Sequence, residues 1–136
     1  MTVRVLIADD QAPFRAAARS VLSATADFQL VGEATSGEEA LELAASLGPD
    51  LVLMDITMSG IGGIEAARAI SAGYPGTVTI LLSTYREEDL PDEARTCGAA
   101  AYLHKSDFGG HVLRELWENR RYRTSARYRT TAITRL

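Results

Sequence analysis

The sequence predicts an α/β domain with a doubly wound, five-stranded parallel sheet flanked by five helices. Short apolar runs of strand length alternate along the chain with segments of helical periodicity, and the connections between them are short. The clearest strand is residues 51–55, four apolar residues that end in Asp55. A continuous apolar run bounded by turn residues is typical of a strand that helices cover on both faces. The alternation therefore favours parallel strands joined by crossover helices.

The individual elements follow in order from the amino terminus. We expect strands over residues 3–8, 28–34, 51–55, 78–83 and 99–103, and helices over about 12–25, 36–47, 63–73, 91–97 and 107–120. Pro13 stands near the start of the first helix, where proline is tolerated. Ser36 and Glu39 have the spacing of a capping box, which predicts the start of the second helix. Gly48 and Pro49 predict its end.

Pro91 restricts the fourth helix. Proline in a helix interior costs about 3 kcal/mol, because it removes a hydrogen bond and clashes with the preceding turn. We therefore expect either an acidic loop over residues 87–90 or a helix that begins near Leu90 and Pro91. Asp92 and Glu93 favour such an N-terminus.

The composition is that of one soluble domain. The 136 residues are 46% hydrophobic and 24% charged, which is ordinary for a globular protein with a real core. No apolar run approaches 18 residues, and the first residues enter a strand directly, so we expect neither a membrane span nor a signal peptide. The single Cys97 cannot form an internal disulfide, which fits a reducing cytoplasm, and we expect it to line the core.

Charge is unevenly placed along the chain. Residues 1–118 carry all 18 acids against 8 basic residues, a formal charge of −10, whereas the last 18 residues carry six arginines and no acid. We therefore predict a folded domain over 1–120 and a basic tail or linker over 121–136. The acidic domain is a poor nucleic-acid binder by itself. We interpret the tail as a solvated extension or linker, with phosphate binding as the alternative, and we expect no DNA-binding domain in it.

Three carboxylates follow strands of the predicted sheet. Asp9 and Asp10 come directly after the first strand, and Asp55 ends the third. Side chains at the carboxyl ends of neighbouring parallel strands meet at one edge. At about 4 Å and an effective dielectric near 20, each pair of like charges repels by roughly 4 kcal/mol. The cluster therefore predicts a hard cation, Mg²⁺ or Mn²⁺. Alternatively, one of the paired aspartates caps the first helix and the other is solvated.

Two more polar residues follow strands at the same edge. Ser83 ends the fourth strand, and Lys105 follows the fifth. The set suits phosphoryl transfer onto a carboxylate. Asp55 would be the nucleophile, the paired aspartates would hold the cation, and the hydroxyl and ammonium would contact the phosphoryl oxygens.

These residues, in this order and at domain-scale spacing, resemble a response-regulator receiver domain with the CheY-like (flavodoxin-like) fold. The stretch from Ala8-Asp9-Asp10-Gln11 to Phe14-Arg15 resembles the NarL/FixJ (LuxR-type) subfamily, and the likeness covers residues 3–118. The resemblance implies that Asp55 is the phosphoacceptor and that Ser83 and Tyr102 are the switch residues. It further implies that Lys105 is the lysine that the family carries at this site. The implied metal ligands are Asp9, Asp10, Asp55 and the backbone carbonyl of Thr57.

The chain departs from the family pattern in several places. Ser59 stands where a proline is frequent and Gly62 where a side chain could hydrogen-bond, so we expect a more mobile loop after the acceptor. Ser106 replaces a proline that many relatives carry after the lysine, so the bend there is less fixed. Thr84 replaces a small residue and would restrict access to the pocket. Pro91 changes the fourth helix, so we expect an altered partner-facing surface.

By this resemblance the chain is a cytoplasmic phosphorelay switch of a two-component system, not an enzyme of turnover. A sensor histidine kinase would phosphorylate Asp55 with Mg²⁺ bound, and the face built from residues 84–105 would then bind a partner protein or form a homodimer. The chain would be the regulatory part of a LuxR-type transcriptional regulator that reaches DNA only through a module absent from it. We expect no contact with a membrane.

Other functions fit the sequence less well. A stand-alone or phosphorylation-independent receiver acting as a protein-binding module is the first alternative, although the complete set of site residues argues against independence from phosphorylation. An aspartate-nucleophile phosphatase would carry a second acid where this chain has Thr57. A dinucleotide fingerprint over residues 60–65 lacks its third glycine.

Overall fold

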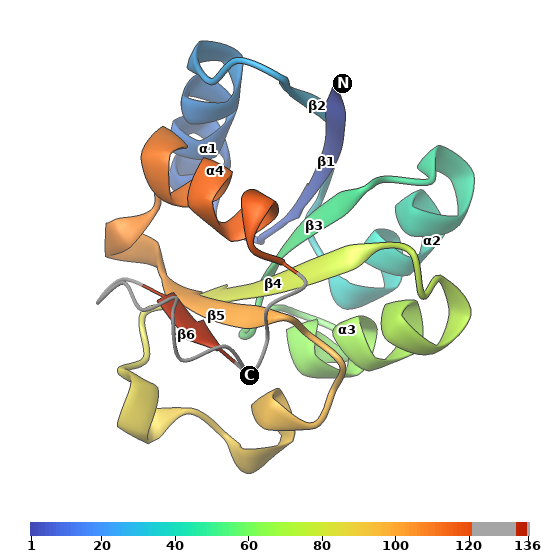
Figure 1. The fold of residues 1–136 in the computed structure, drawn as a ribbon. Helices are drawn as coiled ribbons and strands as arrows, with labels where there is room; N and C mark the ends of the chain where they lie inside the picture. The colour runs from blue at the N-terminus through green and yellow to red at the C-terminus, as the bar shows by residue number, and fades with distance from the viewer. Residues whose placement is uncertain (121–132, 136) are drawn as a thin grey trace.

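A single six-stranded sheet forms the centre of the molecule. The computed structural model describes residues 1–120 and 133–135, and the strand order is β2-β1-β3-β4-β5-β6 (Figure 1). The five parallel strands are β1 (Val3–Ala8), β2 (Phe28–Ala34), β3 (Leu51–Asp55), β4 (Val78–Ser83) and β5 (Ala101–His104). The short strand β6 (Ile133–Arg135) pairs antiparallel with β5. The predicted fold class is confirmed.

Helices cover both faces of the sheet (Figure 1). They are α1 (Ala12–Ala24), α2 (Gly37–Leu47), α3 (Gly62–Gly73) and α4 (Gly110–Glu118). Apolar residues of α1 and α4 pack in one core cluster, and those of α2 and α3 pack in the other. Alternate residues of β3 enter opposite clusters: Leu53 lies with α1 and α4, whereas Met54 lies with α2 and α3. All five residues of β3 are buried, as the apolar run predicts.

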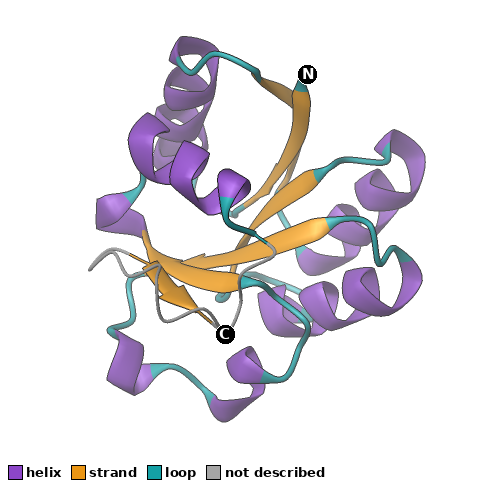
Figure 2. Ribbon diagram, in the orientation of Figure 1, coloured by secondary structure: helices purple, strands orange, loops and turns teal. Residues whose placement is uncertain are grey.

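The helix predicted over residues 91–97 is absent from the described part of the chain, which has four α-helices, one fewer than expected. Two single 3₁₀ turns replace it between β4 and β5, η1 (Glu87–Asp89) and η2 (Asp92–Arg95) (Figure 2). Leu90 and Pro91 between them are extended, with ψ of 136° and 145°. Proline forces its predecessor out of the helical region, so the turn of helix cannot continue. Leu90 remains buried in the core beside α3.

Several element ends differ from their predicted positions. The last helix begins at Gly110, later than the predicted residue 107, because the separate 3₁₀ turn η3 (Lys105–Asp107) precedes it.

The capping box of α2 forms: the backbone N–H of Glu39 donates to Ser36 Oγ at 3.1 Å. The Glu39 carboxylate accepts from the N–H of Thr35 at 2.6 Å, one residue before the cap. One half of the capping box is thus as predicted, and in the other half the glutamate bonds the N–H before the N-cap residue.

The predicted basic tail lies mostly outside the described residues. The structure does not describe residues 121–132 and 136. Of the tail beyond residue 120 it describes only 133–135, as β6. In that pairing Thr134 lies opposite Tyr102 of β5. Nothing in the sequence indicated a strand there. Among the described residues, no helix combines the length and the apolar character that crossing a membrane requires.

The start of α3 approaches the end of β3 closely. Gly63 is buried, its N–H donates to the carbonyl of Ile56 at 3.0 Å, and a Cβ on it would stand 1.8 Å from the Asp55 carbonyl oxygen. Only glycine allows this approach. It fixes the direction in which the chain leaves Asp55.

We expect Gly63→Ala to lower the free energy of unfolding by about 3 kcal/mol, because the methyl group must push α3 away from β3. Urea denaturation followed by circular dichroism measures the change. Gly73→Ala in the same helix is the matched control, since a Cβ there meets nothing within 4 Å. Equal stabilities of the two variants would contradict the role given to this contact.

Candidate functional site

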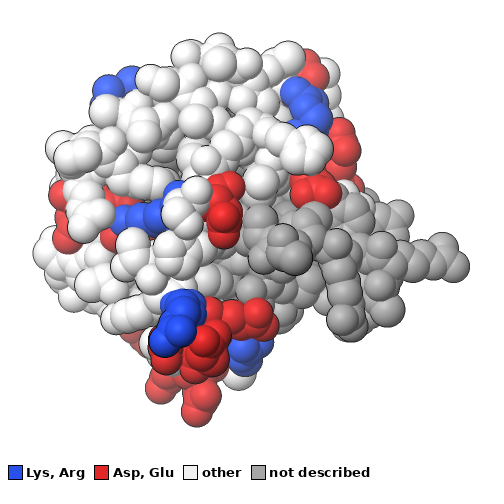
Figure 3. Space-filling view, turned by 90° about the vertical axis from the view of Figure 1, so that its left-hand side faces the viewer, with Lys and Arg blue, Asp and Glu red and all other residues white. Residues whose placement is uncertain are grey.

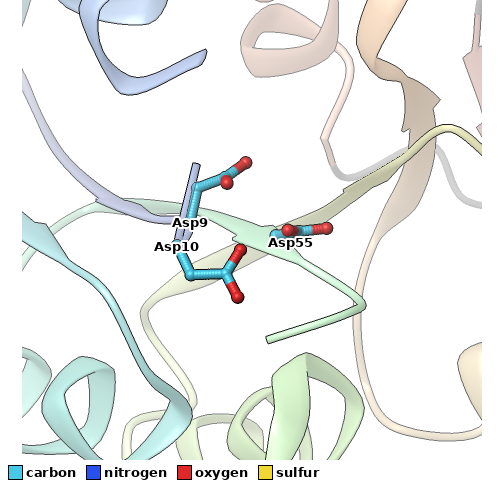
Figure 4. Close-up of side chains that lie close together, drawn as sticks. All are labelled: Asp9, Asp10 and Asp55. Atoms are coloured by element: carbon cyan, nitrogen blue, oxygen red, sulfur yellow. The ribbon is translucent and has the colours of Figure 1, made fainter. Parts of the chain in front are cut away.

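Three carboxylates lie side by side at the carboxyl edge of the sheet (Figure 4). β1 and β3 are neighbours, and Ala8 pairs with Met54, so the next residues, Asp9 and Asp55, are brought together. One oxygen from each of Asp9, Asp10 and Asp55 lies within 4.8 Å of the others. Asp9 and Asp55 are buried, whereas Asp10 is exposed. The predicted convergence of these three residues is confirmed.

Lys105 supplies the positive charge at this cluster. Its Nζ lies 2.7 Å from Asp9 Oδ2 and 3.3 Å from Asp55 Oδ2, and its side chain is only 9% exposed. The ammonium also donates to Gln11 Oε1 at 3.1 Å and lies 4.8 Å from the centre of the Phe14 ring. Ion pairs, an amide acceptor and a cation–π contact therefore hold the lysine in place.

Gln11 and Phe14 are parts of the site that sequence reasoning did not assign. The backbone N–H of Gln11 donates to Asp9 Oδ1 at 2.8 Å, so this residue contacts both an acid and the lysine. Its position directly after the acidic pair was the available signal. Phe14 gave only the 3.6-residue spacing of a core helix, and that spacing does not reveal a ring placed against a cation.

Ser83 lies on β4, the neighbour of β3, and Tyr102 lies on β5, the next strand beyond it. Ser83 ends β4, is buried, and accepts from the N–H of Tyr85 at 2.9 Å. The hydroxyl of Tyr102, a buried residue of β5, donates to the carbonyl of Ser83 at 3.0 Å and to the carbonyl of Tyr85. Burial raises the pKa of Tyr102. The tyrosine ring is thus held inward by the chain that follows β4.

An open cavity of about 350 Å³ joins these residues. The predicted site residues line it, Asp9 and Tyr102 excepted, and the full lining is Asp10, Gln11, Asp55, Thr57, Ser83, Thr84, Tyr85 and Lys105. Thr84, expected to restrict access, is one wall of this cavity and is exposed. Asp55, although buried, thus forms part of the lining of an open cavity.

Burial and the neighbouring Asp9 raise the pKa of Asp55 from 3.8 to about 6. The charge of Lys105 and the N–H of Thr57, which donates to Asp55 Oδ1 at 3.3 Å, act in the opposite direction. Asp9 Oδ2 is buried and receives no hydrogen bond of good geometry, although the ammonium of Lys105 lies 2.7 Å away. The single positive charge of Lys105 therefore does not neutralise all the negative charge of the neighbouring carboxylates.

A hard divalent cation fits this donor set. The three carboxylates offer oxygens within 4.8 Å of one another, and the single ammonium of Lys105 does not neutralise all of their charge. Oxygen-only ligands are those that Mg²⁺ and Mn²⁺ prefer. Thr57 lines the cavity, and the metal role of its carbonyl stays a prediction.

The loop after Asp55, which we expected to be mobile, is tied to the start of α2. Glu38 Oε1 accepts from the N–H of Ile61 at 2.6 Å, and Ser36 forms an isolated parallel bridge with Ser59. Gly60 and Gly62 adopt φ of +79° and +80°, a region that favours glycine. A Cβ on Gly60 would also collide with the Glu38 carboxylate. The glycine at 62, a departure from the family pattern, therefore has a backbone reason.

Residues 5–116 match the family described as the response regulator receiver domain. The chain belongs to this family.

Curated relatives of the chain are response regulators. Response regulator GacA of Pseudomonas viridiflava is 39% identical over 103 residues, which is 76% of this chain and 48% of GacA. Response regulator UvrY of Escherichia coli is 36% identical over 123 residues, which is 88% of this chain and 56% of UvrY. The chain thus spans about half the length of the curated relatives it matches.

Solved receiver domains share the fold. The signal receiver domain of NarL from Mycobacterium tuberculosis has a TM-score of 0.80 and 31% identity, and the match covers 88% of this chain and 96% of that one. A LuxR-family two-component response regulator from Aurantimonas has a TM-score of 0.79 and 27% identity, with 88% and 86% covered. These similarities agree with the predicted LuxR-type relationship.

We expect Asp55→Asn to raise the melting temperature of the metal-free protein at pH 7.5 by roughly 5 °C, the change that about 1–2 kcal/mol produces in a domain of this size. Because the folded pKa of Asp55 lies above its unfolded value, its protonated form stabilises the fold below about pH 4. That stability is lost as the pH rises through about 6, and the uncharged amide does not lose it.

Thermal unfolding of both proteins in EDTA, from pH 4 to 8, measures the difference. The advantage of the variant should shrink as the pH falls. Asp27→Asn, at an exposed carboxylate paired only loosely with Arg114 at 3.8 Å, is the matched control. A stability difference that does not vary with pH would contradict the buried-charge explanation.

Proposed function

We propose that the chain is a phosphorylation-controlled switch of a two-component system, in which Asp55 accepts a phosphoryl group from a sensor histidine kinase. The observation that carries the proposal is the placement of Asp55: its carboxylate lines an open cavity, 3.3 Å from the Lys105 ammonium and beside two further acids. Membership of the receiver family supports it.

The transfer forms one bond and breaks one. An oxygen of the Asp55 carboxylate attacks phosphorus, the bond between phosphorus and the histidine nitrogen of the kinase breaks, and an acyl phosphate results. With a pKa of about 6, Asp55 is mostly ionised near pH 7.5 and so available as a nucleophile. The buried setting keeps it from being strongly solvated.

Positive charge is needed because the incoming phosphoryl group is anionic. Lys105, already within 3.3 Å of Asp55, is placed to contact a phosphoryl oxygen. A bound Mg²⁺ or Mn²⁺, held by Asp9, Asp10, Asp55 and the carbonyl of Thr57, would neutralise the charge of the phosphoryl oxygens. Gln11 and the Phe14 ring keep the lysine at the cavity during this step.

Ser83 and Tyr102 give the switch its moving parts. Ser83 Oγ now accepts from Tyr85 N–H, and it would turn to donate to a phosphoryl oxygen. The Tyr102 hydroxyl bonds the carbonyls of Ser83 and Tyr85, so a movement of that segment changes its partners. A local bond at the site thereby biases the packing of β5.

The output surface in this proposal runs from residue 84 to 105. Its segment between β4 and β5 carries exposed acids at five positions, Glu87, Glu88, Asp89, Asp92 and Glu93. Figure 3 shows acidic and basic side chains gathered at the lower end of the molecule. Because two 3₁₀ turns replace a helix there, we propose that a partner protein or second copy meets a surface of unusual shape.

We further propose that the chain regulates transcription in the cytoplasm, as part of a LuxR-type regulator whose DNA-binding module is not in this sequence. The curated relatives, which are about twice as long, support this. A phosphatase is disfavoured because Thr57, without a carboxyl group, stands two residues after Asp55. A phosphorylation-independent receiver would have no use for the complete set of acids, hydroxyl and lysine.

Incubation with acetyl phosphate, read by intact mass, tests the proposal. We expect a gain of one phosphoryl group that requires Mg²⁺, disappears in EDTA and is lost in Asp55→Asn. Asp27→Asn, an exposed acid outside the cavity, should label like the wild type. Labelling of Asp55→Asn at the wild-type level would exclude Asp55 as the acceptor.

A second test distinguishes two reasons for failed labelling. Either acetyl phosphate is a poor phosphodonor for this site, or the site cannot bind a phosphoryl group. Mg²⁺ together with beryllofluoride, a phosphoryl mimic, should raise the melting temperature of the wild type and leave that of Asp55→Asn unchanged. Absence of both labelling and this shift would overturn the proposed switch.

A further inference from the structure

We propose that His104 is a positioning residue, which together with Ser106 fixes the lysine of the phosphoryl-transfer site. The proposal rests on the function proposed above. The imidazole joins the chain after β4 to the chain after β5: its Nε2 lies 3.0 Å from the Thr84 carbonyl, and its Nδ1 contacts both the backbone N–H of Ser106, at 3.1 Å, and Ser106 Oγ, at 2.8 Å.

The contacts determine the state of the ring. Nδ1 faces a backbone N–H of Ser106, which can only donate, so Nδ1 is the acceptor. The proton of the neutral ring is then on Nε2, where it donates to the carbonyl of Thr84. Both nitrogens are used in this way. His104 is therefore not available as a metal ligand or phosphoryl acceptor, and it is not among the residues that line the cavity.

The imidazole bridge lies at the point where the backbone pairing between β4 and β5 ends. Ser83 pairs with His104 in the last register position of β4 and β5. Beyond it, Thr84 borders the cavity and Lys105 extends into it. The imidazole continues the connection between the two strands by side-chain bonds. It thereby holds the residue after the switch hydroxyl at a fixed place relative to the residue that carries the ammonium.

The bridge also accounts for the bend after β5. Ser106 N–H and Oγ both point to His104, within the 3₁₀ turn formed by residues 105–107. A proline at this position would fix φ covalently but could not donate a hydrogen bond. The chain uses hydrogen bonds for the same purpose. The expected looseness of this bend is replaced by a fixed geometry that depends on one imidazole.

The variant His104→Ala removes both arms of the bridge. We expect it to bind one phosphoryl group from acetyl phosphate as the wild type does, but about tenfold more slowly, because the backbone that carries the lysine is no longer fixed relative to the chain after β4. His104→Asn keeps an oxygen that can accept from the N–H two residues later, and it should recover part of the rate. His111→Ala, at the exposed histidine of α4, is the matched control and should leave the rate unchanged.

Rescue separates positioning from a general loss of structure. In the double variant His104→Ala/Ser106→Pro the proline should restore the bend covalently and bring the rate within about threefold of wild type. Wild-type labelling by His104→Ala would overturn the proposal. So would a melting temperature of His104→Ala lowered together with a rate that neither His104→Asn nor the double variant improves.

Amide hydrogen exchange at Ser106 gives a readout that does not depend on phosphorylation. We expect slow exchange in the wild type and at least tenfold faster exchange in His104→Ala, with His111→Ala unchanged. Unaltered exchange in His104→Ala would show that the bridge does not form, whatever the labelling result. Failure of both wild-type labelling and the beryllofluoride shift, alongside the expected exchange pattern, would overturn the proposed function and leave the bridge standing.

Discussion

The ion pairs between Lys105 and the two buried aspartates are the interaction on which the rest of the site depends. Asp9 is fully buried and Asp55 nearly so, and the ammonium lies 2.7 Å and 3.3 Å from their oxygens. Buried carboxylates are costly unless they are paired. A single ammonium is shared between two acids, and burial together with the charge of Asp9 raises the pKa of Asp55 in spite of it. The folded site therefore keeps an excess of negative charge, which attracts further positive charge.

This electrostatic deficit connects the architecture to signalling. The neighbouring strands β1, β3, β4 and β5 bring residues between Asp9 and Lys105 to one edge, so a change of charge there occurs at the ends of four strands. Tyr102 and Ser83 are linked through the backbone carbonyls after β4, directly beside the charge cluster. A packed core responds to such a change by adopting another arrangement instead of deforming gradually.

The sequence predicts those features that local patterns determine. Apolar runs locate the strands, and the residue after each run locates Asp9, Asp55 and Lys105, so the meeting of these charges follows from the order of parallel strands alone. Pro91 predicts an interrupted helix, but two 3₁₀ turns were not foreseeable, because propensity does not decide between short turns. The contacts of Gln11 and His104 depend on residues far away along the chain or on ring orientation. The hydrophobic periodicity of the sequence carries no information about such contacts.

The pairing of β6 with β5 has a consequence for the behaviour of the protein in solution. An unpaired outer strand offers a row of free N–H and C=O groups to any other extended chain. With residues 133–135 beside it, β5 lies inside the sheet, and the backbone of Tyr102 has a neighbouring strand on both sides. Residues 133–135 thus cover an edge of β5 that would otherwise be open to pairing with another extended chain.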